Sequence, residues 1–276
     1  MPELHQTFLK AFSDYLIPIQ LTTEQFDAKV KREGVLPSYC VAAYAGSEMV
    51  GFIMTGLGEW KGQPTAYNAG TGVVPEHRGR QLTKRLYQFL IPKLKESGVT
   101  QCLLEVIQEN KPAFEVYKNI GFQVTRSLDS FRATKEDLLL TTELPEDITI
   151  NLAKKPDWSA YQHLGEVAPS WQNTAAAFTN FPDAKMVLEA RTSDKRLAGF
   201  IAFLVGNGAI LQLAVDPKLR CQGIGTALLR GAAAKSESKS LMLINMDEGA
   251  SDFIAFLNRR YLKRFLGQYE MLMPLE

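Results

Sequence analysis

Two turns of the sequence combine arginine and glycine at a place where an apolar strand is followed by a helix. Residues 73–83 read VVPEHRGRQLT, and residues 214–225 read AVDPKLRCQGIG. The first turn of a helix carries unpaired backbone N–H groups and the positive end of the helix dipole, so this position suits a phosphate group. Arg78 and Arg80 in the first turn, and Arg220 in the second, add the positive charge that a phosphate prefers.

The two turns are copies of each other. They align without a gap, and upstream of them Gly51-Phe52-Ile53 matches Gly199-Phe200-Ile201. The aligned pairs within the turns are Pro75 with Pro217, Arg78 with Arg220, Gln81 with Gly223, and Thr83 with Gly225. A repeat about half the chain apart predicts one fold that occurs twice. We therefore expect a first domain at residues 1–134, a linker at 135–147 and a second domain at 148–276.

The hydrophobic pattern predicts that each half is α/β, with a mixed α+β sheet. In the first half we expect a polar loop at 58–64 carrying Trp60, helices at 4–16, 22–30, 82–96 and 110–118, and strands at 40–44, 49–57, 65–74 and 101–107. In the second half we expect strands at 148–152, 186–191, 197–205, 209–215 and 241–245, and helices at 161–167, 171–178, 223–235 and 253–259. The longest helix of each half therefore follows its phosphate-type turn.

A second motif, N-x-x-A-x-x-x-Y-x-x-x-G-F at residues 110–122, follows the first turn. It resembles one signature of the GNAT acetyltransferase superfamily. The sequence R-x-x-G-x-G at residues 220–225 resembles the acyl-CoA pyrophosphate loop of the same superfamily. The resemblance covers nearly the whole chain as two tandem copies. It implies that acetyl-CoA binds between two splayed central strands and that its acetyl group passes directly to an amine.

Acyl transfer to an amine needs a base that removes the ammonium proton and an acid for the departing thiolate. Tyr117 resembles the thiolate-protonating tyrosine of the family, and Asn110 resembles its pantetheine-facing asparagine. Glu105 lies between Leu104 and Val106 as in the ribosomal-protein alanine acetyltransferases, which this segment resembles and in which a glutamate at this place acts as base. The alternatives are a core role for Tyr117, a structural role for Glu105 and a helix cap at Asn110.

The resemblance implies that acetyl-CoA is the co-substrate, and we expect no metal. Both copies contain candidate contacts to acetyl-CoA, although the second copy could bind it weakly, bind something else or only support the first. Backbone near the end of each strand would pair with the pantetheine arm, and the turns would hold the pyrophosphate. The expected contacts in the first copy are Val73, Val74, Arg78, Gly79, Arg80, Gln81, Leu82, Thr83, Asn110 and Tyr117. Those in the second copy are Ala214, Val215, Arg220, Gln222, Gly223, Ile224, Gly225 and Thr226.

The two copies are unequal. The first turn has Gln81 and Thr83 where the family prefers glycine or alanine, although their backbone N–H groups remain. In the second copy, Leu257 falls at the place of the tyrosine and Ala250 near that of the asparagine, so no hydroxyl acid is evident unless Tyr261 reaches in. We therefore expect catalysis in the first copy.

The leading hypothesis is an acetyl-CoA-dependent N-acetyltransferase that acts on a primary amine of a small molecule or peptide. The alternative is an acyl-CoA-binding regulatory or scaffold protein without turnover. A nucleotide phosphate-loop enzyme is disfavoured, because neither turn has a lysine followed by serine or threonine. Trp60, Tyr67 and Trp171 are candidates for an acceptor pocket or for ordinary packing, and His77 beside the first turn is expected at the surface.

Composition narrows the range of partners. A net charge of +1 without runs of like charge argues against nucleic-acid binding. The three scattered cysteines form neither a disulfide framework nor a zinc-binding spacing, which favours a reducing compartment. Cys102 is a weak candidate nucleophile, with only His5, His77 and His163 available to activate it. Without a signal peptide or a membrane-length apolar run, we expect a cytoplasmic protein with no membrane partner, while the oligomeric state is open.

Overall fold

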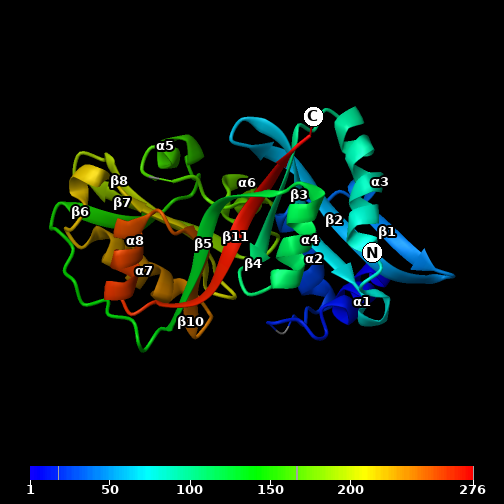
Figure 1. Cartoon of the computed structure of the whole chain (residues 1–276). Coiled ribbons are helices and arrows are strands. Elements are labelled where there is room, and N and C mark those ends of the chain that lie inside the picture. The colour runs from blue at the N-terminus through cyan, green and yellow to red at the C-terminus, as the bar shows by residue number, and fades with distance from the viewer. Residues whose placement is uncertain (18, 166, 276) are drawn as a thin grey trace. The chain divides into compact units, whose positions relative to one another are not determined.

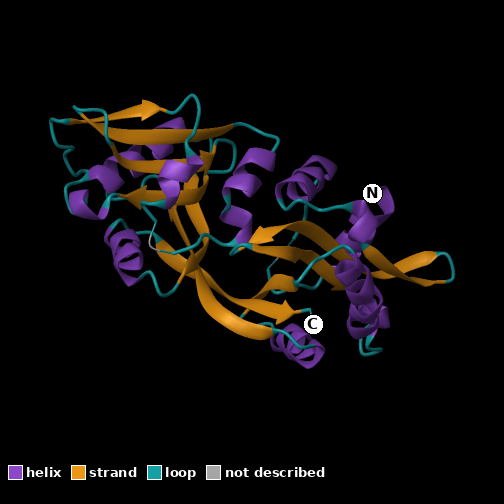
Figure 2. Cartoon of the chain, turned by 90° about the horizontal axis from the view of Figure 1, so that it is seen from above, coloured by secondary structure: helices purple, strands orange, loops and turns teal. Residues whose placement is uncertain are grey.

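The chain forms two compact units, and the computed structural model describes residues 1–17, 19–165 and 167–275. Unit 1 comprises Met1–Arg126 and Gln268–Glu276, and unit 2 comprises Ser127–Gly267. Each unit combines strands with helices (Figure 1, Figure 2), so the expected mixed α/β fold is confirmed. Among the described residues, no helix is long and apolar enough to cross a lipid bilayer.

Unit 1 contains a mixed sheet in which the strands follow the order β1-β2-β3-β4-β11. Its strands are β1 (Val41–Ala45), β2 (Glu48–Trp60), β3 (Gln63–Val73), β4 (Gln101–Ile107), and parts of β5 (Gln123–Thr134) and β11 (Lys263–Pro274). Its helices are α1 (Pro2–Ala11), α2 (Thr23–Arg32), α3 (Leu82–Glu96) and α4 (Lys111–Ile120), with short 3-10 helices η1 (Pro37–Tyr39) and η2 (Pro75–His77).

Neighbouring residues of β2 show that helices cover both faces of this sheet. Phe52 packs against Phe8 of α1, with the ring centroids 6.0 Å apart. The next residue, Ile53, lies in a buried cluster together with Leu86 and Leu90 of α3. Successive side chains of a strand point to opposite faces, so α1 and α3 pack on opposite faces of the sheet.

Unit 2 has the strand order β5-β10-β9-β8-β7-β6. Besides its part of β5, its strands are β6 (Ile148–Leu152), β7 (Lys185–Thr192), β8 (Leu197–Leu204), β9 (Ala209–Val215) and β10 (Ser240–Asp247). Its helices are α5 (Trp158–Gln162), α6 (Ala175–Asn180), α7 (Ile224–Lys235) and α8 (Ser251–Arg259), with 3-10 helices η3 (Trp171–Asn173) and η4 (Pro217–Leu219). The expected helix at 161–167 is shorter and begins earlier, and its residue 166 lies outside the described residues.

In unit 2, the matching triplet Gly199-Phe200-Ile201 also places its phenylalanine and isoleucine on opposite faces of the sheet. Phe200 of β8 stacks on Tyr161 of α5, with the ring centroids 4.1 Å apart. Ile201 instead lies in the buried cluster that contains Leu228 and Leu229 of α7. The repeat found in the sequence is therefore a repeat of the three-dimensional packing.

The two central parallel strands of each unit pair only briefly. In unit 1, β3 pairs with β4 at residues 65–67 and 101–103, and the two strands then part. In unit 2, β9 pairs with β10 at residues 209–210 and 242–243. Just beyond the paired segment, β3 also has an extra residue, Ala69, relative to β2. A β-bulge of this kind re-aims side chains and is common beside active sites.

The last strand of the chain completes unit 1. β11 pairs antiparallel with β4 at residues 268–274 and 101–107. In unit 2, β5 pairs antiparallel with β10 at residues 128–134 and 240–247. β11 does not appear among the sequence-based expectations, because a pairing between segments this far apart leaves no local periodicity. The domains expected at 1–134 and 148–276 describe the two copies in the sequence and remain a proposal. The compact units have different boundaries, because β11 at the end of the chain belongs partly to unit 1.

The expected loop at 58–64 is wrong, because β2 and β3 continue through it as a hairpin. β2 runs to Trp60 and β3 begins at Gln63. The two turn residues, Lys61 and Gly62, both have positive φ, at 52° and 76°. Such a turn matches the twist of the two strands. Trp60 is therefore a buried strand residue and not a loop aromatic.

Several predicted helix ends are confirmed. The Thr22 side chain accepts the Gln25 N–H, and the Gln25 side chain accepts the Thr22 N–H, which together form a capping box. Helix α3 ends at Glu96, two residues before Gly98. Asn110 caps α4, since its Oδ1 accepts the N–H of Ala113 at 3.2 Å.

Both phosphate-type turns follow the same backbone path. In the first, Gly79 and Gln81 have φ of 74° and 56°. In the second, the aligned Cys221 and Gly223 have φ of 62° and 85°. Left-handed backbone favours glycine, so each copy has a glycine at only one of its two unfavourable positions.

The segment between the halves lies against the second turn. A Cβ built on Gly223 would lie 2.2 Å from the carbonyl oxygen of Glu143. Arg230 of α7 holds this segment by donating to the carbonyl oxygens of Leu140 and Thr142, at 2.9 and 3.1 Å. A Cβ built on Gly79 would meet no described atom within 4 Å. The first turn is therefore open at Gly79, and its Gln81, the counterpart of Gly223, is exposed, whereas Gly223 itself is covered by the chain's own backbone.

This difference predicts that Gly223→Ala destabilises the protein far more than Gly79→Ala. Both changes place a side chain at positive φ, which costs about 1–2 kcal/mol. Only at Gly223 would the new methyl group overlap a backbone carbonyl. In thermal unfolding, we expect Gly79→Ala to lower Tm by roughly 3–6 °C and Gly223→Ala by at least twice as much. Equal shifts in Tm would contradict the packing of the linker on the second turn.

Candidate functional site

The candidate site of unit 1 lies where β3 and β4 part. Asn68 is the first residue of β3 beyond the paired segment, and Glu105 lies two residues beyond Leu103, the last paired residue of β4. Tyr117 reaches this place from α4, and its ring packs edge-on against Tyr87 of α3, with centroids 6.4 Å apart. The structure thus brings Glu105 and Tyr117 to the same opening and adds Asn68, which the sequence analysis did not identify.

Asn68 holds two tyrosine hydroxyl groups. Its Oδ1 accepts the N–H of Gly70 at 3.0 Å and the hydroxyl of Thr71 at 3.1 Å, which fixes the orientation of the amide. Its Nδ2 then donates to the hydroxyl oxygens of Tyr87 at 2.9 Å and Tyr117 at 3.5 Å. Since Tyr117 accepts from Asn68, its own proton points elsewhere. The signal in the sequence was an amide in the middle of a strand, directly before the bulge.

Tyr117 is held in its neutral form by burial. The side chain is 9% exposed and lies in the cluster of α3, α4 and the sheet. Loss of water around the phenol raises the pKa of Tyr117, because burial disfavours the charged phenolate. A phenol that keeps its proton at neutral pH can donate it to a stronger base.

Glu105 lies at the same opening as a half-buried residue whose Oε1 is out of contact with water. Tyr67 of β3 donates a hydrogen bond to Oε2 of Glu105, and the buried Oε1 has no hydrogen-bond partner among the described residues. Burial raises the pKa of Glu105 to about 8, and the hydrogen bond from Tyr67 opposes this shift. A carboxyl group whose pKa lies near the working pH, with one unpartnered oxygen, is suited to accept a proton.

The two titratable groups lie on opposite faces of the sheet. Cys102, Leu104 and Val106 point into the cluster that contains Tyr117. By the alternation of side chains along β4, Glu105 points to the other face. A molecule in the gap between β3 and β4 would therefore have Glu105 on one side and Tyr117 on the other.

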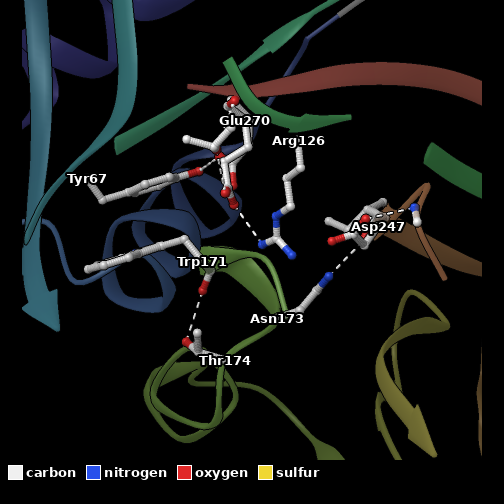
Figure 3. A network of polar contacts seen from close by, with 11 residues as sticks. Tyr67, Arg126, Trp171, Asn173, Thr174, Asp247 and Glu270 are labelled. Carbon is white, nitrogen blue, oxygen red and sulfur yellow. Dashed lines mark hydrogen bonds and ion pairs between the residues drawn. The ribbon is translucent and has the colours of Figure 1, made fainter. Parts of the chain in front are cut away.

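A buried ion pair lies on the same face as Glu105. Arg126 of β5 donates to Oε2 of Glu270 at 2.7 Å, and Glu270 of β11 is 1% exposed. Figure 3 shows Arg126 turned toward Glu270, with the hydroxyl of Tyr67 pointing into the same group of side chains. The guanidinium also lies 5.4 Å from the ring centroid of Trp60. Sequence reasoning missed Arg126 and Glu270, because their strands meet only through long-range pairing.

The arginine of each turn fastens the turn to its own unit. Arg78 forms an ion pair with Asp14 at 2.7 Å and donates to the carbonyl oxygens of Ala11 and Val73. Arg220 donates in the same way to the carbonyl oxygen of Val215 at 3.1 Å. Arg78 is thus held by protein partners, and its expected phosphate contact stays a prediction. A structural arginine at this position can still fix the turn whose N–H groups would bind the phosphate.

Arg80 is a second exposed cation of the first turn, after Arg78. It donates to the carbonyl oxygen of Glu76 at 3.4 Å, a contact that a bound anion could replace. The backbone positions expected beside it lie at the end of β3 and the start of α3, namely Val73, Val74, Gly79, Gln81, Leu82 and Thr83. Asn110 caps α4 and also donates to the hydroxyl of Tyr15 at 3.3 Å.

The second copy has a turn without the side chains of the first site. Ala250 occupies the cap position of α8 and makes no side-chain cap, while Leu257 is fully buried at the position of Tyr117. Tyr261 is 55% exposed in the turn after α8. The other expected contacts lie at the end of β9 and the start of α7, namely Ala214, Val215, Gln222, Ile224, Gly225 and Thr226.

The remaining candidates are ordinary core or surface residues, with one exception. Cys102 is buried, and burial raises the pKa of its thiol to about 12, which leaves no reactive thiolate at neutral pH. Trp171 is buried in η3, and the Thr174 hydroxyl donates to its carbonyl oxygen (Figure 3). His77 is half-buried at the end of η2. Tyr67 is the exception, since it contacts Glu105. The described residues contain no cluster of three or more potential metal ligands.

Comparison with known proteins identifies the family of this chain. The model of the family described as "Acetyltransferase (GNAT) family" matches residues 2–122 and 154–255. A mycothiol acetyltransferase of Thermobifida fusca (strain YX) is 30% identical over 129 residues, which are 44% of this chain and 40% of that protein. The N-alpha-acetyltransferase MAK3 of Arabidopsis thaliana is 30% identical over 86 residues, 31% of this chain and 45% of that protein. The chain thus spans less than half the length of these curated relatives.

Solved structures share the fold over nearly the whole chain. A tandem GNAT protein from the clavulanic acid biosynthesis pathway has a TM-score of 0.72 at 14% identity, over 99% of this chain and 95% of that chain. A GCN5-related N-acetyltransferase from Sphaerobacter thermophilus has a TM-score of 0.75 at 17% identity, over 99% and 92% of the two chains. Because the family model matches most of the chain in two separate regions, the chain belongs to the GNAT family of acetyltransferases, in its tandem form.

Proposed function

We propose that unit 1 transfers the acetyl group of acetyl-CoA to a primary amine of a small molecule or peptide, by direct attack within a ternary complex. The observation that carries this proposal is the placement of Glu105 and Tyr117 on opposite sides of the gap between β3 and β4. Direct transfer needs the nucleophile to enter and the leaving group to depart at different sides of one carbonyl carbon. A base on one side and an acid on the other meet this need.

The residues of unit 1 fit acetyl-CoA. The turn at residues 78–83 is open at Gly79, and its backbone leads into the start of α3, where N–H groups lack helical partners. Arg80 adds an exposed positive charge there. The edge of β3 that faces β4 is unpaired with β4 beyond residue 67, so its backbone can pair with the amide groups of a pantetheine arm.

Acetyl-CoA would supply an activated thioester, and the protein would manage two protons. Glu105 accepts the proton that the acceptor amine loses, and Oε1 is the available oxygen because Oε2 is held by Tyr67. The C–N bond forms as the C–S bond breaks. Tyr117 donates its phenolic proton to the departing sulfur, and the amide of Asn68 keeps that proton directed away from itself.

The relatives support an amine acceptor without defining it. The Arabidopsis relative is named an N-alpha-acetyltransferase, and the Thermobifida relative a mycothiol acetyltransferase. A decisive assay is release of free thiol from acetyl-CoA across a panel of amines that includes peptide N-termini and amino sugars. Acetyl-CoA binding without thiol release for any amine would contradict the proposal.

Unit 2 would support unit 1 without carrying out chemistry. Its turn lies against the linker at Gly223, and Leu257 replaces the tyrosine of the first copy. We therefore propose that acetyl-CoA binds at the first turn and not at the second.

This assignment predicts one acetyl-CoA per chain in isothermal titration calorimetry. Gln81→Glu adds a carboxylate to the first turn and should weaken acetyl-CoA binding by roughly tenfold, since repulsion of the pyrophosphate is worth about 1–1.5 kcal/mol. Gln222→Glu adds the same charge to an exposed position of the second turn and serves as the matched control. Two bound molecules per chain, or equal weakening by both changes, would place the ligand elsewhere.

Tyr117→Phe should lower kcat by about 10²-fold while the Kd for acetyl-CoA stays within twofold. The phenyl ring keeps the packing against Tyr87 but has no proton to donate. Steady-state kinetics together with calorimetry separates the two effects. Tyr87→Phe, which removes the other hydroxyl that Asn68 holds, is the control and should change kcat much less. An unchanged kcat in Tyr117→Phe would remove this residue from the mechanism.

The raised pKa of Glu105 gives the enzyme an alkaline pH dependence. A base must be ionised to act, and the pKa of Glu105 is about 8, so kcat/KM should rise with pH through about 8. The assay should use an acceptor amine whose ammonium group titrates well above this range, so that the titration of the acceptor is not mistaken for that of Glu105. Glu105→Gln should lower kcat/KM by about 10²-fold and remove the rise. The same rise in Glu105→Gln as in the wild type would assign the base to another group.

A further inference from the structure

Glu270 reaches the candidate site from the far end of the chain. In the pairing of β11 with β4, Glu270 lies directly opposite Glu105. Residues that face each other across an antiparallel pair point to the same face of the sheet, with Cβ atoms about 5 Å apart. The last strand of the chain therefore places a second carboxyl group beside the proposed base.

Glu270 is fully occupied, in contrast to Glu105. Its Oε2 accepts from Arg126 at 2.7 Å, and its Oε1 accepts from the hydroxyl of Thr125 at 2.9 Å. The Arg126 side chain is 11% exposed, and its guanidinium lies over the ring of Trp60 at 5.4 Å. Both carboxyl oxygens of Glu270 are thus held by protein donors, and one of these donors is the guanidinium of Arg126.

We propose that Glu270 is a positioning residue for the base: with Arg126, it sets the electrostatic field in which Glu105 gains and loses its proton. The proposal rests on the function assigned to Glu105 above. Its consequence is that the C-terminal strand, and not only the first half of the sequence, determines the pH range in which unit 1 works.

Among the described residues, four groups act on the pKa of Glu105. They are the hydroxyl of Tyr67 on β3, the carboxylate of Glu270 on β11, the guanidinium of Arg126 on β5, and Glu33 directly after α2. Glu33 is neutralised by Lys29 and Arg32, at 2.6 and 3.0 Å.

These groups act on Glu105 in opposite directions. Burial is the main cause of the raised pKa of Glu105, and Tyr67 opposes it through its hydrogen bond. Glu270 raises the pKa of Glu105 by repulsion of a second negative charge, and Arg126 lowers it by attraction. The two members of this ion pair therefore shift the pKa of Glu105 in opposite directions, and each effect can be removed by one substitution.

The test is the titration midpoint of Glu105 in the full chain, followed by NMR of carbon-13-labelled glutamate carboxyl groups. Glu105→Gln identifies the signal. Glu270→Gln should lower the midpoint by about one pH unit, and Arg126→Gln should raise it by about one pH unit. The double variant should return it close to the wild-type value. The alkaline rise of kcat/KM should move in the same directions.

A matched control comes from the same two strands within unit 2. Arg264 of β11 forms an ion pair with Asp129 of β5 at 2.6 Å, and Asp129 is buried. Asp129→Asn removes this partly exposed ion pair, and Asp129 is not among the groups that act on the pKa of Glu105, so the midpoint of Glu105 should stay within a few tenths of a pH unit. If Glu270→Gln does not fold, Arg126→Gln and Arg126→Lys provide the test. Only Arg126→Gln removes the positive charge, so only this variant should move the midpoint of Glu105.

Opposite shifts in Glu270→Gln and Arg126→Gln support the inference, and any other pattern overturns it. The NMR titration does not require turnover. If no amine is acetylated but the midpoint moves as described, the proposed function fails while the coupling of Glu270 to Glu105 stands. If turnover is found but the midpoint of Glu105 does not move, the proposed function stands while the coupling of Glu270 to Glu105 fails.

Discussion

The separation of β3 from β4 is the constraint on which the rest of unit 1 depends. Parallel strands normally pair along their length, yet here the pairing ends at residues 67 and 103. Beyond that point, β4 stays paired on its other edge, where its backbone groups that point toward β11 are satisfied. On β3, the bulge at Ala69 turns Asn68 toward the tyrosines. A gap that would otherwise leave a sheet incomplete thus becomes a place where a ligand can reach both faces.

Duplication provided two such gaps, and the two copies differ in how their turns are used. The backbone of the turn is the same in both, with positive φ at equivalent positions. In the first copy the turn is open and followed by Asn110 and Tyr117. In the second, the linker occupies the space at Gly223, and Leu257 fills the place of the tyrosine with a hydrophobic core residue. A glycine that resembles a phosphate-binding feature in sequence is required here by a protein backbone contact.

Local features of this protein could be predicted from its sequence, and long-range features could not. Residue type and spacing act over a few residues. They account for the caps at Thr22 and Asn110, for the length of α3, and for the repeated packing of Phe52 and Phe200 on the same face of their sheets. The same holds for the placement of Tyr117 on a helix after the first turn. The course of β2 to Trp60 was missed because polar residues and glycine around it indicate a loop equally well.

The site was predictable only in part, for the same physical reason. Glu105 and Tyr117 lie in motifs, whereas Asn68 acts through a bulge, and Glu270 and Arg126 meet through strand pairing between distant segments. The ion pair of Arg78 with Asp14 was not foreseen, because no local pattern links the two residues. Charge at a turn indicates an electrostatic role without identifying the partner.

A crystal structure of the full chain with bound acetyl-CoA tests the central claim most directly. The account predicts the pyrophosphate on the backbone of residues 78–83, the pantetheine arm along β3, and the thioester between Glu105 and Tyr117 in the gap of unit 1. It also predicts no acetyl-CoA at residues 220–225. Acetyl-CoA at the second turn, or a thioester that lies outside the gap between β3 and β4, would contradict it.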